Sequence, residues 1–227
     1  MRPRAVFFDL DDTLIDRADA FTRYVEDLIV RHPAAFAGTQ RQAVVAELRE
    51  WDARGSSDRI GFCQQVTSRY PGIELAPEAL WEDMTSRLPG FVQSHLAIRA
   101  LVMKLSKQLP VTVVTNGSGR MQRQKLAAAK IDMYLPEVFI SGEVGEDKPH
   151  PFIFGVALAW AERAPKDVLH VGDDPERDIA GAARMGLATC WVSHGRPWPR
   201  ELPPPTFTVP TITDDVRDIQ EVLARWT

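Results

Sequence analysis

The chain has 227 residues, of which 44% are hydrophobic and 26% are charged. This balance is typical of a globular protein with a buried core, and it excludes disordered and collagen-like chains. The formal net charge is only −4 and the two signs are interspersed, so the sequence lacks the basic surface that binding to a nucleic acid polymer or an anionic membrane requires.

Cysteine usage and the first apolar run indicate the cellular compartment of the protein. Cys63 and Cys190 lie far apart without a neighbouring cysteine or a histidine cluster, which indicates neither a disulfide framework nor a thiolate zinc site. The apolar run at residues 5–8 is followed by aspartates and is too short for a signal peptide or a membrane span. We therefore expect a cytoplasmic protein.

Short runs of β-branched and aromatic residues predict strands that are buried on both faces. They are residues 4–10, 111–115, 137–141, 167–171 and 188–192. Helical patterns separate the later runs, at residues 94–108, 119–130, 151–164 and 175–185. Strands that alternate with helices predict an α/β fold, with a Rossmann-like parallel sheet covered by helices on both faces.

One segment interrupts this alternation. Residues 17–88 show only helical periodicity, in the pieces 20–31, 41–54, 57–70 and 77–87, which turn signals separate. We therefore predict a Rossmann-like core at residues 1–15 and 90–227 and an inserted all-helical domain at residues 16–89. At the other end of the chain, residues 213–225 predict a closing helix with Asp214 and Asp215 in its first turn.

Polar residues gather where the predicted strands end. In a parallel sheet, ligands bind beyond the carboxyl ends of the strands, so we expect these residues to lie close together. A glycine-containing turn after the second strand also exposes backbone N–H groups to an anion. The candidate residues are Asp9 and Asp11; Thr115, Asn116 and Gly117; Lys148; and Asp173, Asp174 and Asp178.

This set of groups suits phosphoryl transfer. Clustered carboxylates repel one another unless a hard cation lies among them, and Mg²⁺ binds carboxylate and carbonyl oxygens, water and phosphate. Lys148 and the N–H groups after Thr115 are suited to the remaining phosphate oxygens. A carboxylate that attacks phosphorus gives an acyl phosphate, which water then cleaves.

The order of these residues resembles the haloacid dehalogenase superfamily. Residues 6–13 (VFFDLDDT) match its first signature, Thr115 the second, Lys148 with the following proline the third, and residues 172–178 (GDDPERD) the fourth. Four signatures in the family's order are far more specific than one short motif. The helical insert directly after the first signature looks like the type-one cap of the same superfamily.

The resemblance implies a role for Asp9, Asp11 and Asp173. Asp9 would be the nucleophile, and Asp11 would protonate the leaving oxygen and later activate water. The carboxylates of Asp9 and Asp173, with the backbone carbonyl of Asp11, would hold Mg²⁺ as the cofactor.

The remaining matched residues would bind or orient. Thr115 and Lys148 would bind the phosphoryl oxygens together with the turn at Asn116 and Gly117. Asp178 would orient Lys148 or a metal-bound water, and Asp174 would lie behind the metal ligands.

Asp11 separates two branches of the superfamily. Its dehalogenases lack a carboxylate there because halide leaves without a proton, whereas an alcohol that leaves phosphate needs one. The resemblance thus implies a Mg²⁺-dependent phosphatase for small phosphorylated metabolites, such as nucleoside monophosphates or sugar phosphates. Residues 140–154 and 186–192 look most like the pyrimidine 5'-nucleotidase and N-acylneuraminate-9-phosphatase group. We expect a monomer or a homodimer.

Other interpretations remain open. A phosphomutase of the same superfamily would return the phosphoryl group to its substrate, although the insert shows no clear second acid or base. A receiver-like phospho-acceptor module also combines acids, a hydroxyl and Lys-Pro around Mg²⁺, but it needs no helical insert. Taken singly, Asp173 or Asp174 would serve as a helix cap, and His170 in its apolar strand is interpreted as a core histidine.

Overall fold

A computed structural model describes residues 3–213 and 215–225. The chain divides into two compact units. The first, called the core unit, runs to Asp16 and resumes at Ser94; the second, called the insert unit, is Arg17–Gln93. The boundaries predicted from sequence, after residues 15 and 89, lie within a few residues of these.

The described part of the core unit forms a six-stranded sheet in the order β3-β2-β1-β4-β5-β6, with every neighbouring pair parallel. The strands are β1 (Ala5–Phe8), β2 (Val111–Thr115), β3 (Val138–Ile140), β4 (Val168–Gly172), β5 (Ala188–Val192) and β6 (Phe207–Val209). Strand β1 lies between β2 and β4 and is fully buried. The parallel α/β sheet predicted from sequence is confirmed.

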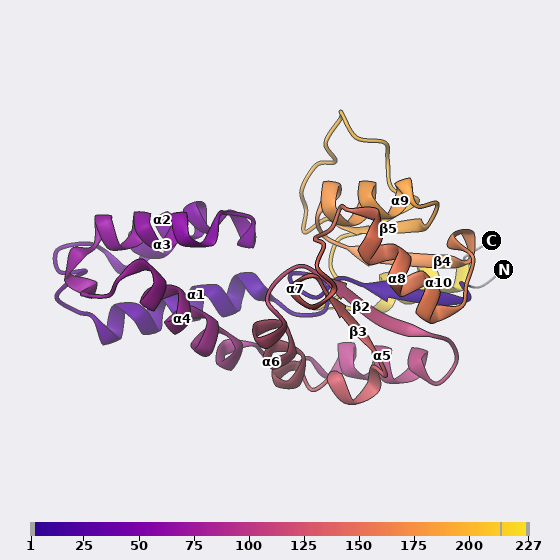
Figure 1. The fold of residues 1–227 in the computed structure, drawn as a ribbon, viewed down its shortest axis with the longest axis horizontal. Coiled ribbons are helices and arrows are strands. Elements are labelled where there is room, and N and C mark those ends of the chain that lie inside the picture. The colour runs from indigo at the N-terminus through magenta and orange to yellow at the C-terminus, as the bar shows by residue number, and fades with distance from the viewer. Residues whose placement is uncertain (1–2, 214, 226–227) are drawn as a thin grey trace. The chain divides into compact units, whose positions relative to one another are not determined.

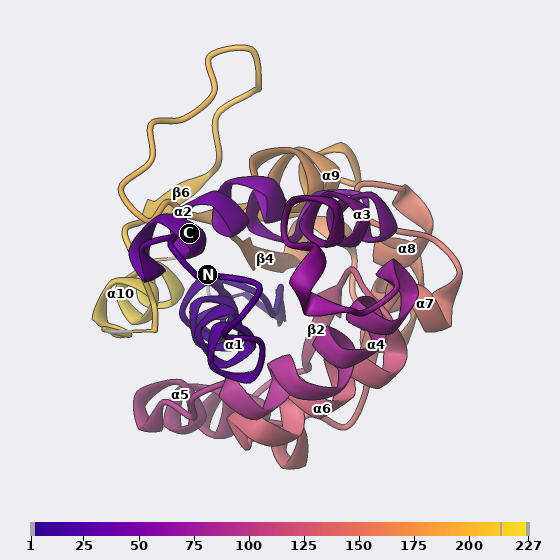
Figure 2. The same cartoon turned by 90° about the vertical axis from the view of Figure 1, so that its left-hand side faces the viewer.

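Helices lie on both sides of the sheet (Figures 1 and 2). They are α5 (Leu96–Ser106), α6 (Gly119–Ala129), α7 (Ser141–Val144), α8 (Pro151–Ala161), α9 (Gly181–Arg184) and α10 (Arg217–Arg225), with short turns η4 (Asp132–Tyr134) and η5 (Pro165–Asp167). Helices α8 and α9 pack their apolar residues against Phe7, Val114 and Phe139 of the sheet. This layered packing buries the strands along their length.

The insert unit is helical throughout its regular elements. It contains α1 (Arg17–Arg31), α2 (Arg41–Asp52), α3 (Arg59–Arg69) and α4 (Pro77–Arg87), with short turns η1 (Ala53–Gly55), η2 (Pro71–Ile73) and η3 (Leu88–Phe91). The rings of Phe21 and Phe62 pack edge to face, with centroids 6.0 Å apart. A buried ion pair joins α1 to the end of α2, with Arg17 Nη1 2.6 Å from Asp52 Oδ2.

Two predicted elements differ from the structure. The helix predicted at residues 175–185 begins as a π-helix, η6 (Pro175–Ala180), before α9. The N–H groups of Asp178 and Ile179 both donate to the carbonyl of Asp174, and this wider first turn carries Asp178 inward, where it is buried. Strand β6 was not predicted, because its three residues lie within the proline-rich tail and do not stand out there as a strand.

The closing helix starts later than expected. Helix α10 begins at Arg217, and Asp215 precedes it and accepts a hydrogen bond from the Arg217 N–H at 2.9 Å. Asp214 lies outside the described residues. Cys63 and Cys190 are buried free thiols. Within residues 3–213 and 215–225, the helices are all too short or too polar to cross a membrane.

Candidate active site

Three central strands bring the predicted site residues to one edge of the sheet. Asp9 follows β1 directly, and its N–H donates to the carbonyl of Val171 in β4 at 2.8 Å. Thr115 is the last residue of β2, and Asp173 follows β4. Because β1 lies between β2 and β4, these residues meet at the carboxyl ends of the strands, where open parallel sheets bind their ligands.

Lys148 joins two of the carboxylates. Its ammonium nitrogen lies 2.6 Å from Asp9 Oδ1 and 2.6 Å from Asp178 Oδ1, and it also donates to the carbonyl of Val114 at 2.7 Å. All three charged side chains are buried. An ammonium group has three N–H donors, so each of them already has a protein acceptor.

Asn116 holds the loop that carries Lys148. Its amide nitrogen donates to the carbonyl of Lys148 at 2.9 Å, and its amide oxygen accepts from the N–H of Lys148 at 2.7 Å. This pair of bonds fixes the backbone of Lys148 against the end of β2. The amide side chain of Asn116 is therefore occupied, and the substrate-binding role predicted for this residue is left to its backbone.

Gly117 differs from the sequence-based expectation. Its backbone N–H donates to the hydroxyl of Ser141 at 2.9 Å, so it does not point to an anion as predicted. Gly117 has a φ of +136°, a conformation that glycine adopts without strain. Its carbonyl accepts from the N–H of Gly142 at 3.0 Å, which makes this turn a fixed connection to the residues after β3.

Carboxylates crowd together at this edge of the sheet. Among the described residues, Asp9, Asp173 and Asp178 are buried and offer oxygens that all lie within 4.8 Å of one another. The guanidinium of Arg196 lies 3.0 Å from Asp173 Oδ2. Buried carboxylates at this spacing need cations around them.

The pKa values of the buried groups in this cluster depend on burial and on the charges beside them. Burial raises the pKa of Asp9 well above its ordinary value; Lys148 opposes this, while Asp178, Asp173 and Asp11 raise it further. For Asp178, burial also raises the pKa, but Lys148 and His170 together outweigh burial, and the pKa lies below its ordinary value. Burial lowers the pKa of Lys148, yet Asp178 and Asp9 raise it above the ordinary value. Lys148 thus stabilises the ionised forms of both carboxylates, but at Asp9 burial and the neighbouring acids outweigh its effect.

The balance of charge at the site indicates whether a divalent cation fits there. The four carboxylates of Asp9, Asp11, Asp173 and Asp178 contact three cationic side chains, those of Lys125, Lys148 and Arg196. A phosphate monoester brings a further charge of about −2. A hard cation with two positive charges would fit here, because it would let Asp9 ionise and the phosphate approach, and oxygen ligands are the type that Mg²⁺ prefers.

Asp11 lies beside helix α6. Its two carboxylate oxygens each accept from Lys125 Nζ at 2.8 Å, and one also accepts from Gln122 Nε2 at 3.0 Å. Gln122 Nε2 also donates to the hydroxyl of Thr115 at 2.8 Å. The structure therefore links the candidate acid-base residue to the candidate phosphate-binding hydroxyl through one helix.

The sequence contains a signal for these two helix residues. The buried positions of α6 are Met121, Gln122, Lys125, Leu126 and Ala129. They follow the spacing of a core-facing stripe. A glutamine and a lysine in the middle of such a stripe need buried polar partners, and Asp11 and Thr115 supply them.

The two remaining candidates do different things. Asp174 caps the π-helix, because one of its carboxylate oxygens accepts from the N–H groups of Glu176 and Arg177 at 2.9 and 2.8 Å. Asp178 contacts Lys148 with one oxygen and accepts the Asp174 N–H with the other, at 3.0 Å. The helix-capping interpretation thus describes the contacts of Asp174, and Asp178 lies where it can orient Lys148.

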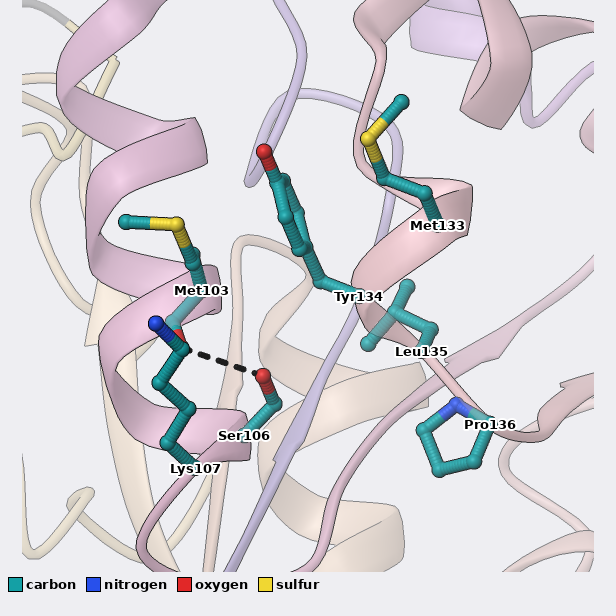
Figure 3. A pocket seen from close by; sticks show the side chains of 7 residues that line it. All are labelled: Met103, Ser106, Lys107, Met133, Tyr134, Leu135 and Pro136. Atoms are coloured by element: carbon teal, nitrogen blue, oxygen red, sulfur yellow. Dashed lines mark hydrogen bonds between the residues drawn. The ribbon is translucent and has the colours of Figure 1, made fainter.

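A separate hollow of about 430 Å³ lies between the end of α5 and η4. Figure 3 shows Met103 and Lys107 on one side of it and Met133 and Tyr134 on the other. The described residues that line it include no carboxylate. Its lining offers no carboxylate ligand for a hard cation, so we place the candidate site at the strand ends.

The fold and the acidic strand ends are typical of a hydrolase of the Rossmann-like α/β class. A match between this chain and a protein-family model agrees with this assignment. The model of the haloacid dehalogenase-like hydrolases matches residues 6–192. The chain belongs to this family. The resemblance drawn from the four signatures is confirmed.

Two curated relatives are similar along nearly the whole chain. N-acylneuraminate-9-phosphatase of Homo sapiens is 27% identical over 229 aligned residues, which cover 94% of this chain and 92% of the relative. A pyrimidine 5'-nucleotidase of Escherichia coli is 30% identical over 220 residues, covering 91% and 93%. Both belong to the group whose short motifs the sequence resembles.

A solved structure shares the fold. A HAD-hydrolase of Bacillus subtilis, crystallised with magnesium, matches with a TM-score of 0.68 at 19% identity and covers 99% of this chain and 100% of its own. At this identity the likeness shows the fold and carries no statement about substrates.

Proposed function

We propose that this protein is a Mg²⁺-dependent phosphatase that hydrolyses small phosphorylated metabolites through an aspartyl-phosphate on Asp9. The observation that carries the proposal is the buried contact of Lys148 with Asp9 at 2.6 Å beside the carboxylate of Asp173. Membership of the family and the names of the two relatives, a phosphatase and a nucleotidase, support it.

The first half-reaction forms the aspartyl-phosphate. Lys148 holds Oδ1 of Asp9, so we expect Oδ2 to attack phosphorus. A bond forms between that oxygen and phosphorus, and the bond from phosphorus to the ester oxygen breaks. The electron pair stays on the leaving oxygen, and Asp11 gives it a proton, so the product leaves as a neutral alcohol.

The second half-reaction releases phosphate. Asp11, now ionised, takes a proton from a water molecule as that water attacks phosphorus. The bond between Asp9 and phosphorus breaks, its electron pair returns to the carboxylate, and inorganic phosphate leaves. Asp11 regains its proton and Asp9 is free, so the sum is the hydrolysis of one phosphate ester by one water.

The remaining candidates bind and orient. Asp9 and Asp173, with the backbone carbonyl of Asp11, would hold Mg²⁺, whose positive charge would neutralise the phosphoryl oxygens. The hydroxyl of Thr115 would donate to a phosphoryl oxygen. Lys148 has all three N–H groups engaged, so we assign it an electrostatic contribution to phosphate binding rather than a direct hydrogen bond.

The substrate class follows from the leaving group and from the relatives. An acid at Asp11 suits alcohol leaving groups, which need a proton, and not halides. The two relatives are named for a pyrimidine nucleotide and for a phosphorylated nine-carbon sugar acid. We therefore propose nucleoside monophosphates and sugar phosphates as the substrates.

The test is release of inorganic phosphate from a panel of nucleoside monophosphates, sugar phosphates and phosphorylated sugar acids. The wild-type protein with Mg²⁺ should hydrolyse members of this panel, and an Asp9→Asn variant should lose about 10³-fold or more of that rate, because the nucleophile is gone. Asp167→Asn is the matched control, since Asp167 is an acid of the core unit at the opposite end of β4. Equal release from the Asp9→Asn variant would disprove the assignment.

A further inference from the structure

Two buried side chains of α6 touch the proposed acid-base residue. Lys125 and Gln122 are 2% and 1% exposed. An ammonium group is costly to bury unless carboxylates pair with it, and the carboxylate that Lys125 contacts is that of Asp11. Packing alone would be served by an apolar residue at this position of the helix, because the positions beside it are Met121 and Leu126.

Lys125 restrains the direction of the Asp11 carboxylate. It contacts both oxygens at 2.8 Å, so rotation of the carboxylate would lengthen at least one contact. Asp11 lies just beyond the end of β1, where its backbone forms an isolated bridge with Ile15 and is not part of a strand. Lys125, anchored on a helix, therefore sets where the proton of Asp11 is delivered.

Gln122 sets the direction of a second proton. The amide nitrogen of glutamine only donates, so the Thr115 oxygen must accept from it at 2.8 Å. The Thr115 hydroxyl then keeps its own proton for another acceptor. Within the described residues this hydroxyl donates to the carbonyl of Asn116, but the distance of 3.5 Å is too long for a strong hydrogen bond. A phosphoryl oxygen at the strand ends is the better acceptor.

We propose that Lys125 and Gln122 are positioning residues of the phosphatase, with Lys125 aiming Asp11 at the leaving oxygen and Gln122 turning the Thr115 hydroxyl toward the phosphoryl group. This inference rests on the proposed function. The two residues are three positions apart on one helix face, so a single rigid element places both protons. Neither touches substrate, and each acts through its partner.

The first test separates positioning from structural support by the leaving group. An aryl ester such as p-nitrophenyl phosphate loses its phenolate without a proton, whereas an alkyl ester such as glycerol phosphate requires one. Lys125→Met keeps the length of the side chain and removes its charge. In single-turnover experiments we expect the first step with the alkyl ester to slow about 100-fold, as for a misplaced catalytic group, and that with the aryl ester about threefold or less.

Arg123→Met is the matched control. Arg123 lies on the same helix and makes an ion pair with Glu143, at 2.7 Å, on the exposed side. It should leave both rates unchanged, and Lys125→Arg should restore part of the alkyl-ester rate because it keeps the charge. Equal slowing of both esters by Lys125→Met would overturn the proposal and assign Lys125 a structural role.

A double-mutant cycle tests whether Lys125 acts through Asp11. In an Asp11→Asn background, Lys125→Met should change the first step with the alkyl ester by less than about threefold, because coupled residues do not give additive losses. A full additional loss would overturn the proposal. If the wild type releases phosphate, Asp9→Asn does not, and Lys125→Met behaves like Arg123→Met, then this inference alone fails and the proposed function stands.

A second variant decides the question if Lys125→Met does not fold. Gln122→Glu has nearly the same shape, but its carboxylate accepts the Thr115 proton instead of donating to the oxygen. The KM for both esters should rise about tenfold, and this rise should disappear in a Thr115→Val background. An unchanged KM, or the same rise without the Thr115 hydroxyl, would overturn the role of Gln122.

Discussion

The ammonium of Lys148 lies 2.6 Å from Oδ1 of Asp9, although 139 positions separate the two residues in the sequence. The contact depends on the strand order, because β1 carries Asp9 into the middle of the sheet and the loop after β3 brings Lys148 over the end of β2. It fixes one oxygen of the proposed nucleophile. It also leaves the charge of Asp9 only partly balanced, since Lys148 contacts Asp178 at the same distance.

That imbalance predicts a strict requirement for a divalent cation. Removal of metal with a chelator should abolish phosphate release, because burial and the neighbouring acids hold the pKa of Asp9 high and Lys148, which Asp9 and Asp178 share, offsets only part of the incoming phosphate charge. Re-addition of Mg²⁺ should restore activity. Asp173→Asn should raise the Mg²⁺ concentration for half-maximal activity at least about tenfold, as the loss of one ligand does.

Binding can be followed without activity. Mg²⁺ should raise the melting temperature of the wild-type protein, because a ligand that binds only the folded state stabilises it. The rise should be smaller for Asp173→Asn and normal for Asp174→Asn, whose carboxylate caps η6 instead. The same rise in all three proteins would place the cation elsewhere.

A substitution at Gly172, the last residue of β4, should change both stability and activity. A Cβ at this position would lie 2.4 Å from Cγ of Asp178, which is far inside van der Waals contact. Gly172→Ala should therefore push Asp178 away from Lys148, lower the free energy of unfolding by about 1–3 kcal/mol and slow phosphate release. Urea unfolding and steady-state kinetics measure the two effects.

Gly155→Ala is the control for this change. Gly155 lies within α8, and a Cβ there meets nothing within 4 Å. The substitution should leave activity unchanged and stabilise the helix by up to about 1 kcal/mol. A Gly172→Ala variant as stable and active as this control would show that Asp178 is free to move.

The buried imidazole of His170 should make the stability of the protein depend on pH. Burial lowers its pKa from the ordinary value of 6.5, so the unfolded chain binds a proton at a higher pH than the folded protein does. The free energy of unfolding should thus fall as pH decreases, by up to about 1.4 kcal/mol between about pH 7.5 and about pH 5.5. This contribution is present above the unfolded pKa and is lost below it.

A variant isolates this contribution from that of the carboxylates. His170→Gln should be less stable than the wild type at the higher pH, because it loses the 3.3 Å contact with Asp178, and should lose less on acidification. His150→Gln changes an exposed histidine that caps α8 and should keep the wild-type pH dependence. The prediction fails if His170→Gln and the wild type lose stability in parallel.

The elements that were predicted from the sequence are those that a local pattern of apolar and polar residues determines. Five strands follow from apolar runs, and Asp9, Thr115 and Asp173 follow from the ends of three of them. The start of η6 was not predictable in this way, because its wider turn depends on Asp178 reaching Lys148 and His170. Strand β6 is three residues long and forms because β5 offers it an edge.

The site residues that were missed depend on tertiary contacts. Arg196 reaches Asp173 from the loop after β5, and the segment around it, residues 193–200 (SHGRPWPR), contains no motif that indicates this contact. Gln122 and Lys125 lie on the apolar stripe of α6, but that stripe does not show that their partners are Asp11 and Thr115. Conversely, the motif predicted an anion-binding N–H at Gly117, which the nearby Ser141 occupies, because sequence order does not show which acceptor a turn meets first.

Asp11 separates the two proposed half-reactions, and its loss should affect them differently. Because it gives a proton to the leaving alcohol, Asp11→Asn should slow alkyl esters by about 10² to 10⁴-fold in the first step and leave an aryl ester much less affected. Water attack also needs Asp11. With an aryl ester and enzyme near the substrate concentration, the variant should release a burst of phenol and then stall as the aspartyl-phosphate on Asp9, which rapid quenching and mass spectrometry detect. If alkyl and aryl esters slow by the same factor and no acyl phosphate accumulates, Asp11 acts only through its charge or its hydrogen bonds to Lys125 and Gln122, and the proton transfers must be assigned to another group.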